Sequence, residues 1–75
     1  MPWWERDVFT ITGTITEFSS FSRQITFNNR HTFVFPGDRE VEHFLTWMMV
    51  SKDSDVIGQT ITLHYSKHDE ITDFS

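Results

Sequence analysis

Four histidines and eleven Asp or Glu residues are the side chains of this chain that could carry acid–base chemistry. General acid–base catalysis places such a group within hydrogen-bond reach of a reacting atom, in a pocket that excludes water. None of the common nucleophile or phosphate-binding motifs occurs, such as G-x-S-x-G, S-x-x-K, G-x-G-x-x-G or the P-loop. The chain is expected to form a small β-barrel from its strand-like segments, and a barrel of this size would be filled by its own side chains. We therefore expect no enzymatic activity and no cofactor.

Metal binding is the second chemistry that the histidines allow. His64 and His68 are four residues apart, and His31 and Asp69 could lie nearby. Imidazole and carboxylate groups suit zinc, but a spacing of four aligns ligands on a helix. This stretch has the pattern of a strand and a turn, so exposed polar residues near a hairpin are the favoured interpretation. The chain has no cysteine, which excludes a thiolate site. We expect no metal site.

Single-stranded nucleic acid would need stacking aromatics and a positive groove. The candidate residues for such a groove are Phe18, Phe21, Arg23, Arg30, His64 and Lys67. In the competing interpretation, Phe18 and Phe21 cover one end of the core and the cations are scattered over the surface. Six Lys and Arg residues against eleven Asp and Glu residues give a net charge of −5, which disfavours binding to phosphate.

Tryptophans provide the candidate contacts to a protein partner. Trp3 and Trp4 lie outside the strand pattern, and Trp47 lies at the margin of a predicted helix. Tryptophan is strongly enriched among the residues that dominate binding energy in protein interfaces. The alternative is that the Trp3–Trp4 pair folds back and covers one end of the domain, because exposed tryptophan pairs favour aggregation.

These residues must be positioned by a chain whose composition favours strands. It has eight Phe, six Ile, five Val and ten Thr, but only two Leu and no Ala. Apolar and polar residues alternate along five segments, as expected for half-buried strands. The segments are Val8–Glu17, Arg23–Asn28, His31–Phe35, Gly58–Tyr65 and Glu70–Phe74. Asn28 and Asn29 tolerate positive φ and predict a turn, whereas Gly13 predicts a bulge or bend within the first strand.

One helix interrupts the strands. Apolar residues recur with helical spacing at Val41, Phe44, Leu45, Met48 and Met49, which predicts one buried stripe. Asp38 is the predicted N-cap, because short polar side chains accept hydrogen bonds from the first free N–H groups of a helix. The element order is therefore β-β-β-α-β-β, mainly β with one helix.

This order resembles that of the OB-fold, a five-stranded Greek-key barrel with a helix between its third and fourth strands. The likeness rests on Thr12-Gly13-Thr14-Ile15-Thr16, on Arg23–Phe27 leading into Thr32–Phe35, and on the glycine-led segment Ile57–Leu63. It covers residues 8–74 at the level of architecture, and an SH3-like barrel or a split α+β sheet remains open. The resemblance implies ligands near the loops that join strands 1–2 and 4–5.

The sequence as a whole predicts residues 1–7 as a flanking segment and residues 8–75 as one OB-like barrel. We expect a small binding module that mediates or blocks a protein–protein interaction, with self-association as one form of it. Single-stranded nucleic-acid binding is the alternative. The longest apolar stretch, Phe44–Val50, is far too short to span a bilayer, and residues 1–7 lack the apolar region of a signal peptide. A cytoplasmic protein without a membrane partner is the simplest expectation.

Overall fold

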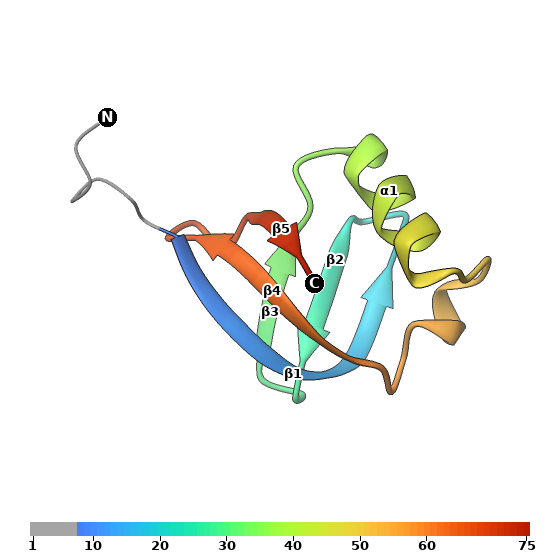
Figure 1. Cartoon of the computed structure of the whole chain (residues 1–75), viewed down its shortest axis with the longest axis horizontal. Helices are drawn as coiled ribbons and strands as arrows, with labels where there is room; N and C mark the ends of the chain where they lie inside the picture. Colours follow the sequence, from blue (N-terminus) through green and yellow to red (C-terminus); the bar gives the residue numbers. More distant parts are fainter. Residues whose placement is uncertain (1–7) are drawn as a thin grey trace.

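The computed structural model describes residues 8–75, which form five strands and one α-helix (Figure 1). The elements are β1 (Val8–Ser19), β2 (Gln24–Phe27), β3 (His31–Val34), α1 (Asp38–Met48), the short 3₁₀ turn η2 (Asp53–Asp55), β4 (Thr60–Ser66) and β5 (Ile71–Phe74). The predicted β-β-β-α-β-β order is confirmed. All five strands belong to one sheet in the order β3-β2-β1-β4-β5, and each neighbouring pair is antiparallel.

The long strand β1 connects the two halves of this sheet. Its residues Val8–Thr14 pair with β4, and from Ile15 onward it pairs with β2. The register with β2 shifts between Ile15 and Glu17, so Thr16 is an extra residue in a bulge. Figure 1 shows β1 as one strongly curved ribbon. The bend that Gly13 predicts therefore occurs where β1 changes partner.

Gly13 leaves room for a close approach of the β2–β3 turn. A Cβ atom at this position would lie 2.7 Å from Nδ2 of Asn28. The Oδ1 atom of Asn28 accepts a hydrogen bond from the N–H of Thr14 at 3.1 Å. Asn28 and Asn29 both adopt positive φ, 54° and 57°, as their residue type predicts. The turn is thus packed onto β1 by a side-chain amide.

The core consists of the residues that alternate toward one side of the sheet, together with two residues of α1. The buried hydrophobic residues are Ile15, Ile25, Phe27, Phe33, Phe35, Val41, Phe44, Val56, Ile61, Leu63 and Ile71. The predicted inward positions of Phe27, Phe33 and Phe35 are confirmed. Each fully buried phenylalanine contributes about 1.5–3 kcal/mol from removing its apolar surface from water.

Helix α1 begins and ends one residue away from the predicted positions. Gly37, in an extended conformation, is the N-cap, and Asp38 is already helical. The prediction of Asp38 as the N-cap is therefore wrong; its carboxylate instead pairs with Arg23 at 3.3 Å. At the other end, Met49 adopts the left-handed conformation with φ 60° and is 90% exposed. Its predicted place on the buried stripe is wrong, because the chain leaves the helix at this residue.

Val41 and Phe44 are fully buried on the predicted stripe, and Leu45 and Met48 pack at its margin. The helix covers one end of the sheet, where Phe44 contacts the rings of Phe35 and Phe74. Within residues 8–75, no helix is long and apolar enough to cross a membrane.

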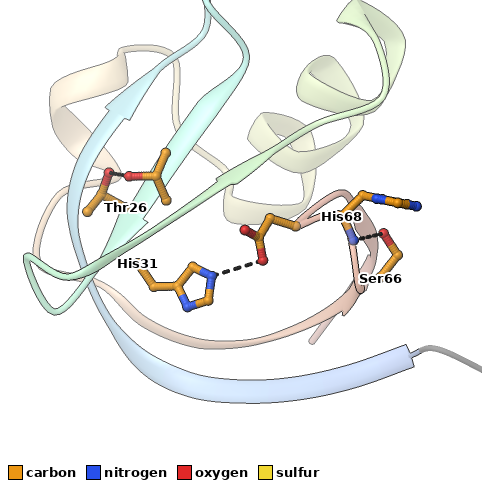
Figure 2. Close-up of polar contacts among 6 residues, drawn as sticks. Thr26, His31, Ser66 and His68 are labelled. Carbon is orange, nitrogen blue, oxygen red and sulfur yellow. Dashed lines mark hydrogen bonds and ion pairs between the residues drawn. The ribbon is translucent and has the colours of Figure 1, made fainter.

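The two edge strands, β3 and β5, meet at one point. Val34 and Glu70 form an isolated parallel bridge, and the N–H of Val34 donates to the carbonyl of Asp69 at 2.8 Å. Figure 2 shows His31 of β3 directed at the carboxylate of Asp69, with 2.9 Å between Nε2 and Oδ1. This contact is a single bridge rather than a ladder of hydrogen bonds. The sheet is therefore not continuously closed, and the predicted barrel stays a prediction.

Candidate protein-interaction surface

The outer face of the sheet is occupied by threonines that bond to one another. Thr12 and Thr62 have their hydroxyl oxygens 2.7 Å apart, and Thr14 and Thr60 have theirs 3.3 Å apart. Such cross-strand pairs stabilise a sheet through its solvent face. On the described outer face the exposed apolar side chains are Val8 and Val34, at 54% and 37%, whereas the turns expose larger and more accessible ones.

Phe21 is the most exposed large apolar residue of the described chain, at 94%. It lies in the turn between β1 and β2, and hydrogen bonds fix this turn. The N–H and the hydroxyl of Ser20 donate to Oδ2 of Asp53, at 2.9 and 3.0 Å. The N–H of Ser22 donates to Oγ of Ser19 at 3.2 Å. An ordered turn therefore holds the Phe21 ring in water.

Phe18 lies in the same segment but is part of the core. It belongs to β1, and its ring centroid lies 5.7 Å from that of Phe44 and 6.1 Å from that of Phe35. The suggestion that Phe18 and Phe21 together cover one end of the domain is thus correct for Phe18 and wrong for Phe21. Among residues 8–75, no ring contact of Phe21 explains its residue type.

The acceptor of these turn bonds, Asp53, belongs to η2 in the connection between α1 and β4. This connection begins with Met49, the second almost fully exposed apolar residue. The Ser20–Asp53 hydrogen bonds thus join two segments that each expose an apolar side chain. We call Phe21, Met49 and the neighbouring carboxylates Asp53 and Asp55 the Phe21 surface.

Trp47 is partly exposed and partly packed, and its predicted role as a protein contact stays a prediction. It is 42% exposed, and its ring packs on Phe74 at 4.9 Å between centroids. Part of its surface thus covers the core beside Phe44, at 6.3 Å. Trp3 and Trp4 lie outside the described residues, so their predicted role as protein contacts stays a prediction.

The residues predicted to bind nucleic acid are divided between several parts of the molecule. Phe21 and Arg23 share the β1–β2 turn, and Arg23 pairs with Asp38. Arg30 lies in the β2–β3 turn at the opposite end of β2. His64 lies on β4 with its Nδ1 3.4 Å from the hydroxyl of Thr10, and Lys67 follows in the β4–β5 turn. The structure therefore does not gather these cations around Phe21.

The histidines form no cluster with metal-binding geometry in the described part of the chain. Of the four residues considered for such a site, the structure brings His31 and Asp69 into contact. The hydrogen bond of His68 in Figure 2 is made by its backbone and not by its imidazole: its N–H donates to Oγ of Ser66 at 3.3 Å.

Comparisons of the whole chain were made against family models, curated proteins and solved structures. No family model, curated protein or solved structure matches this chain. The Phe21 surface must therefore be interpreted from its own chemistry. The sequence pattern predicts Phe21 in a nucleic-acid groove or at the end of the core. The signal that could have indicated this surface is a phenylalanine inside the polar turn sequence Ser-Ser-Phe-Ser, because turn formers leave such a side chain without a buried face. Met49 gave no such signal, since it continues the helical spacing.

Proposed function

We propose that this protein is a non-enzymatic binding module that attaches to another protein through the Phe21 surface. The observation that carries the proposal is the 94% exposure of Phe21 in a turn held by hydrogen bonds to Asp53. Aromatic residues and methionine are enriched in the cores of protein interfaces. A turn that is already ordered loses less conformational entropy on binding, which favours affinity.

The charges around Phe21 favour a protein over a nucleic acid. Asp53, which accepts the turn bonds, and Asp55 place two carboxylates on η2 beside one exposed cation, Lys52. Arg23 of the β1–β2 turn is paired with Asp38. Carboxylates repel a phosphate backbone, whereas they complement a protein pocket with basic residues at its rim. We therefore propose a partner with an apolar pocket and a basic rim, to which this module adds as a subunit or which it blocks as an inhibitor.

We also propose that the scaffold is an OB-like barrel closed between β3 and β5. The parallel bridge between Val34 and Glu70 and the His31–Asp69 hydrogen bond support this closure. The bulge at Thr16 supports it as well, because bulges increase the curvature of a strand. Such a closure would leave the turns as the regions free to bind.

The test is a comparison of three variants of the full chain in affinity capture from the native host, followed by measured affinity for the captured protein. Phe21→Ser should weaken binding about thirtyfold, as expected for an interface anchor worth ~2 kcal/mol. Val8→Ser is the matched control, because Val8 is also an exposed apolar residue, at the start of β1. It should leave affinity unchanged.

Two results would contradict the proposal. One is a partner that Phe21→Ser retains at full affinity. The other is tight binding of a single-stranded oligonucleotide that weakens with salt and is lost in Phe21→Ser, which would establish the nucleic-acid alternative. Sedimentation of the wild type and of Phe21→Ser distinguishes a second copy of this chain from a different partner.

A further inference from the structure

An open hollow of about 330 Å³ lies between β1 and the β2–β3 turn, at the opposite end of β2 from Phe21. Its lining consists of Ile11, Phe27, Asn28, Arg30 and His31. Ile11 is half-buried, and Phe27 beneath it is fully buried, so one side of the hollow is apolar. The polar groups on the other side are one amide, one guanidinium and one imidazole. No carboxylate belongs to this lining.

The absence of carboxylates distinguishes this hollow from two others in the described chain. The hollow between α1 and β5 is lined by Arg39 and His43 but also by Glu40 and Asp73. The hollow beside the end of β1 is lined by Glu17 and no cation. In a chain with a net charge of −5, a lining with a cation and no acid favours negative charge, and the carboxylate of Asp69 contacts this lining only through Nε2 of His31.

The cation of this hollow is available to a ligand. Arg30 is exposed, and within residues 8–75 no carboxylate forms an ion pair with it. A guanidinium binds a carboxylate or a phosphate through two parallel hydrogen bonds. The Oδ1 atom of Asn28 is used by the N–H of Thr14, which leaves the Nδ2 hydrogens as donors. Two sets of donors therefore flank the same hollow.

His31 provides a flat surface beside these donors. Its ring stacks on Phe33, with 4.3 Å between centroids and 12° between planes, and its Nε2 is held by Asp69. Its side chain is nevertheless 43% exposed. The ring is thus held by Phe33, Asp69 and Tyr65, whose ring centroid lies 5.8 Å away, and it keeps exposed surface that a planar group could contact.

We propose that this hollow binds a small organic anion that has a flat apolar body and one carboxylate or phosphate group. The anionic group bonds to Arg30 and to the amide of Asn28, and the flat body lies against His31 and Ile11. The volume falls at the lower end of the range for small-molecule sites, which excludes a large cofactor. This site does not depend on the Phe21 surface.

The proposal is tested by ¹⁵N–¹H NMR titration of the full chain with benzoate and with benzamide, its neutral analogue. Benzoate should shift the amide signals of residues 28–31 and of Ile11, with saturable millimolar affinity. Benzamide should bind at least tenfold more weakly, because it lacks the charge that Arg30 recognises. Equal shifts with both probes would overturn the proposal.

Variants locate the site. Arg30→Ala should weaken benzoate binding about tenfold, whereas Arg39→Ala, which removes the arginine of the α1–β5 hollow, should leave it unchanged. Both arginines are exposed, so neither change should unfold the protein. Unchanged binding in Arg30→Ala, or shifts centred on Arg39 and His43, would overturn the proposal.

The same titration distinguishes the two sources of negative charge. Stronger binding of adenosine monophosphate than of benzoate identifies a phosphate ligand, and the reverse order identifies a carboxylate ligand. Phe21→Ser should change neither affinity, so failure of the proposed protein interaction and failure of this site give separate results.

Discussion

The turn between β1 and β2 and the turn between β2 and β3 lie at opposite ends of one four-residue strand, yet they hold their side chains by different means. The first is bonded through Ser20 to an aspartate of another segment, and it holds Phe21 in water. The second packs the Asn28 amide onto Gly13 and places Arg30 beside an open hollow. The two turns that flank β2 therefore present an apolar group with carboxylates at one end of the strand and a cation with an apolar wall at the other.

This difference indicates which residues stabilise the fold and which are exposed for binding a partner or ligand. A side chain that is packed against the sheet should affect folding when it is changed, and a side chain held in solvent should affect binding only. The predictions below separate the two, from the largest expected effect to the smallest.

The largest effect is expected for Phe18→Ala compared with Phe21→Ala. Phe18 packs on Phe35 and Phe44, so its truncation should lower the free energy of unfolding by about 2–3 kcal/mol, somewhat less than for a fully buried phenylalanine. Phe21→Ala should stay within about 0.5 kcal/mol of the wild type. Urea denaturation followed by Trp fluorescence measures both values. A similar loss in both variants would show that Phe21 is packed.

Phe18 is packed and Phe21 is exposed, and the alternation of apolar and polar residues does not predict this difference. Period-two alternation correctly places Ile15, Ile25 and Phe27 in the core. The bulge at Thr16 then shifts the phase of β1, so that Phe18 faces the core together with the odd-numbered residues before the bulge. A bulge depends on how β1 pairs with β2, which is a tertiary property, and the local pattern does not encode it.

Local sequence patterns are also insufficient at the end of the helix and beside the hollow. The helical period predicts that Val41 and Phe44 are buried, which is confirmed, but it also includes Met49, where a left-handed residue ends the helix. The contact between His31 and Asp69 joins residues 38 positions apart, and no local spacing contains it. Elements and core were thus predictable, whereas the exposed groups that form the candidate sites depended on how the turns pack.

The second-largest effect is expected for Gly13→Val. The added side chain would meet the Asn28 amide, and overpacking of this kind should cost about 2 kcal/mol. Asn28→Gly removes the amide and still tolerates positive φ, so it should restore part of the loss in the double variant. Thermal denaturation of the two single variants and the double variant gives the coupling. Strictly additive losses would contradict the contact.

A smaller effect is expected for Asp53→Ala. This change removes the acceptor of two hydrogen bonds from Ser20 and should lower the free energy of unfolding by about 1–2 kcal/mol. The exchange of the Ser20 amide hydrogen should become faster, because its protecting bond is lost. Asp55→Ala, in the same η2 element without a bond to the turn, is the control. Unchanged exchange at Ser20 would show that other contacts order the turn.

The smallest effect on stability is expected for Asp69→Asn in the β4–β5 turn, which contacts His31 at the start of β3. Asp69 has φ 60°, which asparagine also tolerates, and the Asn Oδ1 atom can still accept the hydrogen bond from His31. The pair is nearly half exposed, so the lost charge should cost less than about 0.5 kcal/mol. The same change removes the carboxylate nearest to the hollow beside Arg30, and benzoate should therefore bind a few-fold more tightly. Weaker binding of benzoate to a folded Asp69→Asn protein would mean that charge does not select the ligand at this turn, and the contrast between the two ends of β2 would then be one of packing alone.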